Sequence, residues 1–137
     1  MTRTVKYIGG IIFLLLIVSI AIGFYMFNKP RDSAASQNTT SSISANSLYN
    51  EYQKNEAAAN LKYLGKIIEV QGKLAVAAND SLQTNLSLYT GHSEGLINCQ
   101  MFNGLVKANL KQGDLINVKG KCTGFLMDVN LVDCIIQ

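Results

Sequence analysis

The sequence is poor in the residues from which catalytic and metal sites are usually built. It contains 1 histidine and 3 cysteines. His92 stands in a Gly-His-Ser turn with no acid–base partner or nucleophile, so we expect a solvated side chain there. The cysteines form no C-x-x-C pair, a zinc site would lack its fourth ligand, and no glycine-rich phosphate loop is present. The sequence therefore predicts no catalytic residue, no metal and no cofactor.

A net positive charge is also missing from most of the chain. The formal net charge of +3 arises in residues 1–32, where basic residues outnumber the single acid, Asp32. From residue 33 onward lysines and acidic residues balance, so this part of the chain is neutral. Proteins that bind a phosphate backbone obtain most of their non-specific affinity from a basic surface. The charge distribution thus argues against nucleic acid as the partner.

One long uncharged run stands near the N-terminus. Residues 7–28 are mostly apolar, with a tyrosine near each end and a lysine directly outside each end. About 20 helical residues cross a hydrocarbon core of roughly 30 Å, and both flanking residue types favour the membrane interface. We expect residues 7–28 to form a transmembrane helix that enters the lipid bilayer as an uncleaved signal anchor. A cleaved signal peptide is the alternative, because Ser33-Ala34-Ala35 suits a peptidase, although such peptides usually have a shorter apolar region.

The segments around this run predict its orientation and the domain boundaries. Residues 1–6 carry Arg3, Lys6 and the amino terminus, which favours a cytoplasmic N-terminus. Residues 29–42 are small and polar and predict a flexible linker, while residues 43–137 suffice for one modest domain. We therefore predict a single-pass protein of the bacterial cytoplasmic membrane with an extracytoplasmic C-terminal domain.

The pattern after residue 42 predicts one helix followed by strands. Residues 44–63 have helical spacing, with Ser44 as N-cap, a hydrophobic staple between Ile43 and Leu48, and Gly65 to end the helix. Alternation then predicts five strands, with a short helix between the third and fourth. The strands are 66–76, 82–90, 96–102, 114–123 and 129–136, the helix is 104–110, and turns fall at 79–80 and 91–92. This order predicts a mainly β fold, the five-stranded Greek-key barrel known as the OB-fold, with an N-terminal helix.

Two short segments of this pattern resemble each other, Val70-Gln71-Gly72-Lys73 and Val118-Lys119-Gly120-Lys121. An inward glycine lets a strand coil sharply at a barrel corner. We expect Gly72 and Gly120 to point inward, together with Val76, and Lys119 to point outward. Two ordinary core glycines are the alternative.

A scattered set of positions within residues 43–137 forms a second pattern. Its positions are Ser44, Leu48, Glu51, Tyr52, Asn55, Glu56, Ala59, Tyr63, Gly65, Lys66, Val70, Gly72, Cys99, Phe102, Gly113, Asp114, Val118, Gly120, Cys122, Leu131, Asp133 and Cys134. This set resembles the bacterial tRNA_anti-like family of OB-fold domains and leaves the apolar run outside. The resemblance implies the barrel fold and a likeness to anticodon-binding OB domains, and it supplies no catalytic residue.

The cysteines are the one chemical peculiarity of the predicted barrel. Alternation points Cys99 and Cys122 inward, where a free thiol behaves as a small apolar group. A hairpin that turns near residues 127–129 would place Cys122 opposite Cys134, and the two could form a disulfide in an oxidising compartment. Three buried thiols are the alternative.

The ligand face of this fold is built on its second and third strands. With Leu82, Thr84, Leu86 and Leu88 inward, that face is rich in amides, uncharged and has one aromatic. Its residues are Gln83, Asn85, Ser87, Tyr89, Asn98 and Gln100. Single-strand nucleic-acid binders stack bases on several aromatics beside basic residues, so this face favours a sugar, a peptide or a protein, and a plain solvated sheet face is the alternative.

The sequence therefore predicts a membrane-anchored, extracytoplasmic OB-fold binding module without catalysis. Its partner would be an envelope protein, a peptide or a saccharide. A nucleic-acid-binding domain similar to tRNA anticodon-binding domains is the rival hypothesis.

Overall fold

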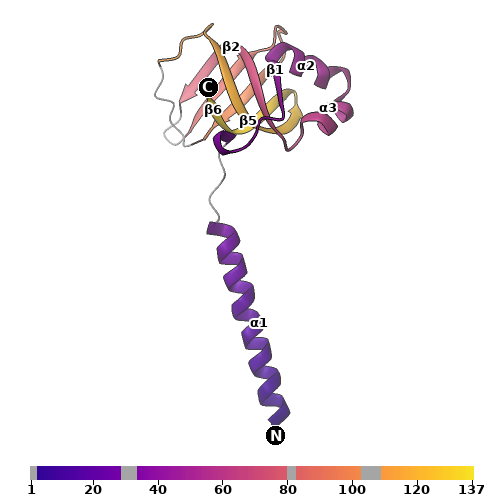
Figure 1. Ribbon diagram of the computed structural model, residues 1–137, viewed down its shortest axis with the longest axis vertical. Helices are drawn as coiled ribbons and strands as arrows, with labels where there is room; N and C mark the ends of the chain where they lie inside the picture. Colours follow the sequence, from indigo (N-terminus) through magenta and orange to yellow (C-terminus); the bar gives the residue numbers. More distant parts are fainter. Residues whose placement is uncertain (1–2, 29–33, 80–82, 103–108) are drawn as a thin grey trace. The chain divides into compact units, whose positions relative to one another are not determined.

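The computed structural model describes residues 3–28, 34–79, 83–102 and 109–137 of the chain, which divides into two compact units, Met1–Arg31 and Asp32–Gln137 (Figure 1). The first unit contains helix α1 (Arg3–Asn28), which begins ahead of the predicted Tyr7. Its segment Gly10–Asn28 has a mean hydropathy of 2.6 and no buried residue. By length and composition α1 can therefore cross a bilayer, as a membrane anchor or a signal sequence would.

The second unit is a closed barrel, which confirms the predicted OB-fold. Its strands are β2 (Ile67–Asn79), β3 (Thr84–Tyr89), β4 (Leu96–Met101), β5 (Leu115–Leu126) and β6 (Asp128–Ile136). They pair in the order β2-β3-β4-β6-β5, and β5 pairs back onto β2. The β4–β6 pair is parallel and the other barrel pairs are antiparallel. Closure gives β3, β4 and β6 a neighbour on both sides, so none of them presents a free edge.

Part of the predicted linker is folded, which corrects that prediction. Strand β1 (Ser41–Ser44) pairs in parallel with β2, and a 3-10 helix, η1 (Ala34–Ser36), precedes it. Ala34 is fully buried, and η1 contacts β5 and β6. A serine-rich strand of four residues has no alternation strong enough to distinguish it from a linker. Residues 29–33 of the predicted linker lie outside the described residues.

The single helix predicted over residues 44–63 is two helices, α2 (Ala45–Lys54) and α3 (Glu56–Tyr63). Ser44 caps α2 as predicted, because its Oγ accepts a hydrogen bond from the Ser47 backbone N–H at 3.1 Å. Asn55 is extended, with φ −161°, and its Oδ1 accepts from the Ala58 N–H at 3.0 Å. It therefore ends α2 and caps α3 at once, a role that suits the short amide of asparagine.

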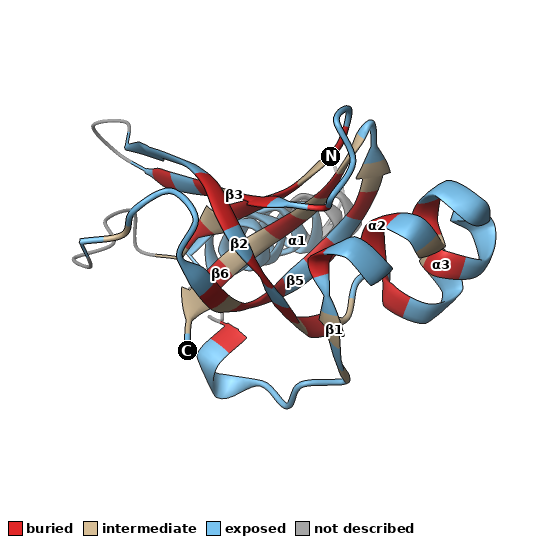
Figure 2. Cartoon of the chain, turned by 90° about the horizontal axis from the view of Figure 1, so that it is seen from above, coloured by how far each residue is buried: buried red, intermediate tan, exposed pale blue. Residues whose placement is uncertain are grey.

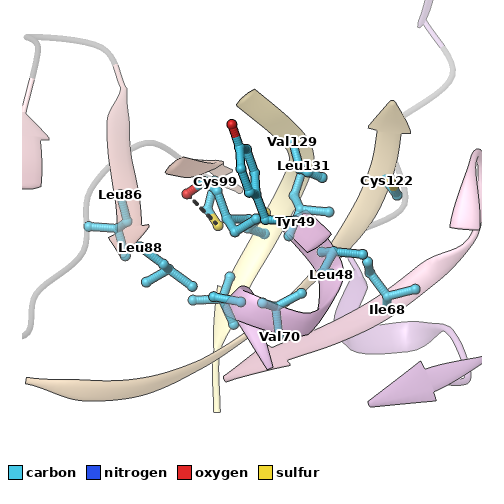
Figure 3. Close-up of a cluster of buried hydrophobic side chains, with 14 of the residues drawn as sticks. Leu48, Tyr49, Ile68, Val70, Leu86, Leu88, Cys99, Cys122, Val129 and Leu131 are labelled. Atoms are coloured by element: carbon cyan, nitrogen blue, oxygen red, sulfur yellow. Dashed lines mark hydrogen bonds between the residues drawn. The ribbon is translucent and has the colours of Figure 1, made fainter. Parts of the chain in front are cut away.

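Helix α2 packs across the barrel strands, where Leu48 and Tyr49 lie among buried side chains of the core (Figure 3). The largest buried side chains are Tyr49 and Tyr52 of α2 and Tyr63 of α3. Leu48, Tyr49 and Tyr52 are buried there, and Tyr52 stacks on Phe125 with ring centroids 5.6 Å apart. Figure 2 shows buried positions along the strands and on both short helices. Each large apolar side chain buried in this way contributes about 1.5–3 kcal/mol.

A β-bulge changes the predicted inner face of β2. The register of β2 against β3 shifts between Leu74 and Val76. Ala75 is therefore buried, while Val76, which we expected inside, is 53% exposed. A bulge inserts one residue and reverses the alternation beyond it.

The two glycines point inward as predicted, but Lys119 does not behave as a surface residue. A Cβ on Gly72 would lie 2.9 Å from Ala45 Cβ, and one on Gly120 would overlap Cys134 Sγ. Lys119 is only 7% exposed and lies between Glu69 of β2 and Ile135 of β6. The expectation that it is exposed was wrong, because η1 packs on the strands β5 and β6.

All three cysteines are buried and free, which is the alternative of three buried thiols rather than the Cys122–Cys134 disulfide. The β5–β6 hairpin turns at Met127 and has a register shift between Cys122 and Gly124, so Cys122 lies opposite Leu131, while Cys134 pairs with Met101 of β4. A hydrogen bond with Cys99, together with burial, raises the pKa of Cys134 above the ordinary thiol range. Cys122 instead lies 3.2 Å from the Tyr52 hydroxyl.

Most of the predicted helix 104–110, and Asp80 and Leu82 near the first predicted turn, lie outside the described residues. Asn109 and Leu110, which the structure does describe, are not helical.

Candidate ligand-binding surface

Strands β3 and β4 bring the predicted face together. Asn85 lies opposite Gln100, and Ser87 lies opposite Asn98. The intervening side chains, such as Leu86 and Leu88, are buried, so alternation leaves the polar residues outside. Gln83 precedes β3 and joins the set, because Gln100 Nε2 donates a hydrogen bond to Gln83 Oε1 at 2.8 Å.

Barrel closure adds two residues from β6 that sequence reasoning missed. Asn130 lies beside Asn98 in the parallel β4–β6 pair. Asp128, at the start of β6, accepts hydrogen bonds from the Leu96 N–H at 2.8 Å and from Asn98 Nδ2 at 2.9 Å. Alternation in residues 128–132 could have shown which side chains point outward, but their proximity to β4 follows only from the topology.

These strands enclose a shallow hollow of about 390 Å³. Its lining is formed by four amide side chains and part of β6, namely Asn85, Asn98, Gln100, Asn130, Leu131 and Val132. Among the residues that the structure describes, no charged side chain lines it. Because each amide offers both donors and an acceptor, this lining can bind hydroxyl or amide groups of either polarity.

Hydrogen bonds fix part of this lining in place. Ser87 Oγ donates to Asn98 Oδ1 at 2.9 Å, and Asn98 Nδ2 donates to Asp128. The Asn98 side chain is therefore fixed by both Ser87 and Asp128, and it forms a rigid part of the lining. Asn85, by contrast, is exposed, and within the described residues its side-chain amide forms no hydrogen bond. Its donors and acceptor remain available to a ligand.

Tyr89, the one aromatic of the predicted face, lies apart from the hollow. It pairs with Leu96 at the end of the β3–β4 ladder and is 44% exposed. Its hydroxyl accepts a hydrogen bond from Gln112 Nε2 at 2.8 Å. The structure thus brings five of the six predicted residues together by register or hydrogen bonding and leaves Tyr89 at the edge.

Two polar contacts away from the hollow involve His92 and Glu51. The side chain of His92 is exposed as expected, although its Nε2 lies 2.8 Å from Asn50 Oδ1. Glu51 accepts hydrogen bonds from Lys62 Nζ and the Tyr63 hydroxyl, each at 2.9 Å, and the Lys62 ammonium lowers the pKa of this carboxyl. Among the residues described, no group of three or more histidine, cysteine or acidic side chains could hold a metal ion.

Comparison with known proteins gives a family and a distant structural likeness. The family model described as tRNA_anti-like matches residues 1–136, and so includes the apolar run that the sequence resemblance left outside. No curated protein matches the sequence.

Two solved structures resemble the barrel. A candidate nucleic acid-binding lipoprotein from Klebsiella pneumoniae is 14% identical, with a TM-score of 0.54, over 80% of this chain and 99% of that one. A candidate aspartyl-tRNA synthetase from Leishmania major is 7% identical, with a TM-score of 0.46, over 83% of this chain and 24% of that one. The first likeness shows the fold alone, and the second is too weak to carry an argument.

Proposed function

Because the chain belongs to the tRNA_anti-like family of OB-fold domains, we propose that it is a membrane-anchored, non-catalytic module that binds an uncharged polar ligand outside the cytoplasm. The observation that carries this proposal is the hollow on β3, β4 and β6, whose described lining includes four amides and no charged side chain. It lies on the surface that this fold commonly uses for ligands.

The pairing of the strands around the hollow favours a saccharide over a peptide that binds as an added strand. A peptide that binds by strand addition needs a free sheet edge, and β3, β4 and β6 are each paired on both sides. A ligand on this face therefore contacts side chains rather than backbone. Sugar hydroxyl and acetamido groups match the donors and acceptors of Asn85, Gln100 and Asn130.

Helix α1 supports the location that we propose. Its apolar segment is long enough to serve as a signal anchor, and the basic residues ahead of that segment favour a cytoplasmic N-terminus. The barrel would then stand on the outer side of the cytoplasmic membrane, where envelope polymers are within its reach.

Nucleic acid is the second candidate, favoured by the family name and by the name of the Klebsiella pneumoniae protein. The neutral charge of residues 33–137 and the single aromatic on the face oppose it, because single-strand binding relies on basic grooves and stacked bases.

Binding measurements on the full chain in lipid nanodiscs separate the two candidates. We expect tetra-N-acetylchitotetraose, as a neutral saccharide probe, to bind with little dependence on salt, and fluorescein-labelled single-stranded RNA not to bind. Asn85→Ala should weaken saccharide binding by roughly two- to tenfold, the value of one hydrogen bond. Gln71→Ala, an exposed amide on β2, is the matched control. Salt-sensitive micromolar binding of the RNA, without saccharide binding, would favour the second candidate.

A further inference from the structure

A second hollow, separate from the amide-lined one, lies beside α2. It measures about 450 Å³ and is lined by Tyr49, Gln53, Glu94, Phe125 and Met127. These residues come from α2, from the segment that joins β3 to β4, and from the β5–β6 hairpin. No motif in the sequence predicts this combination, because the three segments meet only in the folded barrel.

Aromatic rings form a rigid wall of this hollow. Tyr49 and Phe125 meet edge to face with centroids 5.8 Å apart, and Phe125 also stacks on Tyr52. Tyr49 is only 2% exposed, and Gln53 Nε2 donates a hydrogen bond to its hydroxyl at 3.0 Å. Gly95 leaves space for the Tyr49 ring, since a Cβ there would overlap it. The wall is therefore in place before any ligand arrives.

The charge beside the hollow is negative. Among the described residues, Glu94 is the only charged one in its lining, and it is exposed and has no ion-pair partner. An acid beside aromatic rings suits a cation with an apolar stem, because the stem packs on the rings while the charge meets both the carboxylate and the ring faces. The guanidinium of arginine also stacks on aromatic rings, which the ammonium of lysine does less well.

Exposed apolar side chains beside the hollow make the site large enough to contact more than one residue of a ligand. Leu126 is 82% exposed and Met127 is 78% exposed at the tip of the hairpin, where Met127 has a φ of 62°. Large apolar side chains that are exposed next to a hollow can contact a bound partner. They would pack against the partner residues on either side of the side chain that enters the hollow. An anionic lipid surface fits less well, because Glu94 would repel it.

We propose that this hollow is a docking site for an arginine side chain on a segment of a partner protein. The arginine stem packs against Phe125 and Met127, and its guanidinium pairs with Glu94. Leu126 contacts an apolar residue beside the arginine. The site is distinct from the amide-lined hollow and does not depend on what that hollow binds.

Methyl NMR of the full chain tests the proposal, with carbon-13 in the methionine methyl groups and the protein in phosphatidylcholine nanodiscs. The first probe is N-acetyl-arginine methylamide. We expect a saturable shift of the Met127 methyl signal and none of the buried Met101 signal. N-acetyl-norleucine methylamide, which keeps the stem and lacks the charge, should bind at least about twofold more weakly.

Variants identify the groups responsible. Glu94→Gln and Phe125→Leu should each weaken binding of the arginine probe by about two- to fivefold. Glu56→Gln removes an acid that is also exposed, at the start of α3, and should leave binding unchanged. Equal binding of the arginine and norleucine probes, or no effect of Glu94→Gln, would overturn the assignment of a cation site.

A tripeptide tests whether the occupant is a protein segment. Acetyl-Leu-Arg-Leu-amide should bind more tightly than the single residue, and Leu126→Ser should abolish that gain. No gain would show that free cations, not protein segments, are the ligands. A shift of the Met127 signal when phosphatidylglycerol replaces phosphatidylcholine, without any probe, would show that the hollow binds lipid and would also overturn the proposal.

Discussion

Gly120 is a residue whose side-chain position is already occupied by a neighbour, because a Cβ there would overlap Cys134 Sγ and would lie 3.2 Å from the Val132 carbonyl oxygen. The Cys134 thiol thus takes the place that a residue-120 side chain would need. We expect Gly120→Val to destabilise the barrel by about 1–3 kcal/mol, the usual cost of overpacking.

Urea unfolding of the full chain in detergent micelles measures this cost. Lys121→Val is the matched control, since Lys121 is exposed on the same strand and should change the free energy of unfolding by no more than about 0.5 kcal/mol. Cys134→Ala should recover part of the loss in a double variant, because it removes the overlapping sulfur. Equal costs at positions 120 and 121 would contradict the inward placement of Gly120.

Single residues also show where sequence reasoning stops. Alternation correctly placed Gly72 and Gly120 inside, because Gly72 precedes the bulge of β2 and Gly120 pairs with β2 in a ladder without register shifts. It failed at Val76, which lies beyond a register shift that the sequence does not reveal. The predicted site omitted Asp128 and Asn130, because only the folded barrel brings β6 beside β4.

At the scale of elements, Asn55 makes two helices out of one helical pattern. Its side chain caps α3 and its backbone N–H still bonds to the Glu51 carbonyl of α2. Both flanking segments have good helix formers, so the pattern alone predicted a continuous helix. The strands were easier to predict, because each carries its own alternation.

Removing this cap should be costly. We expect Asn55→Ala to lower the free energy of unfolding by about 1 kcal/mol, and to speed hydrogen exchange at the Ala58 amide. Lys54→Ala, one residue earlier and exposed, should have little effect on either measurement. Unchanged exchange at Ala58 would contradict a capping role for Asn55.

The contact between the two helices should also depend on pH. The hydrogen bond from Lys62 lowers the pKa of Glu51 below the ordinary value of a glutamate carboxyl. Because the folded-state pKa is depressed, the ionised carboxylate stabilises the fold above the unfolded pKa, and this contribution is lost as the pH falls through the folded pKa. The effect is small, since the Glu51 side chain is 40% exposed.

A pair of urea titrations checks this sign. Glu51→Gln should be slightly less stable than the unmodified chain at neutral pH, and the difference should vanish at pH values below the pKa of Glu51. A difference that grows as the solution is acidified would be inconsistent with this account.

At the scale of the whole molecule, the proposed membrane anchor predicts location and fractionation. A reporter fused after Gln137 should be active only outside the cytoplasm, and the protein should stay in the membrane pellet at high salt and alkaline pH with Met1 attached. Protease added to spheroplasts should cut at residues 37–40, which are exposed and outside regular structure, rather than in β1. Full protection of the barrel would reverse the proposed orientation.

The burial of Ala34 also sets an order of events. Ala34 belongs to the triplet that would suit a signal peptidase, and in the folded barrel it is fully buried in η1. A peptidase needs its substrate extended in the active site, so it can cut there only before η1 has docked. If a peptidase recognises this triplet, folding and cleavage would compete in time. A barrel that folds quickly would stay attached to its helix, and slower folding would leave more time for cleavage.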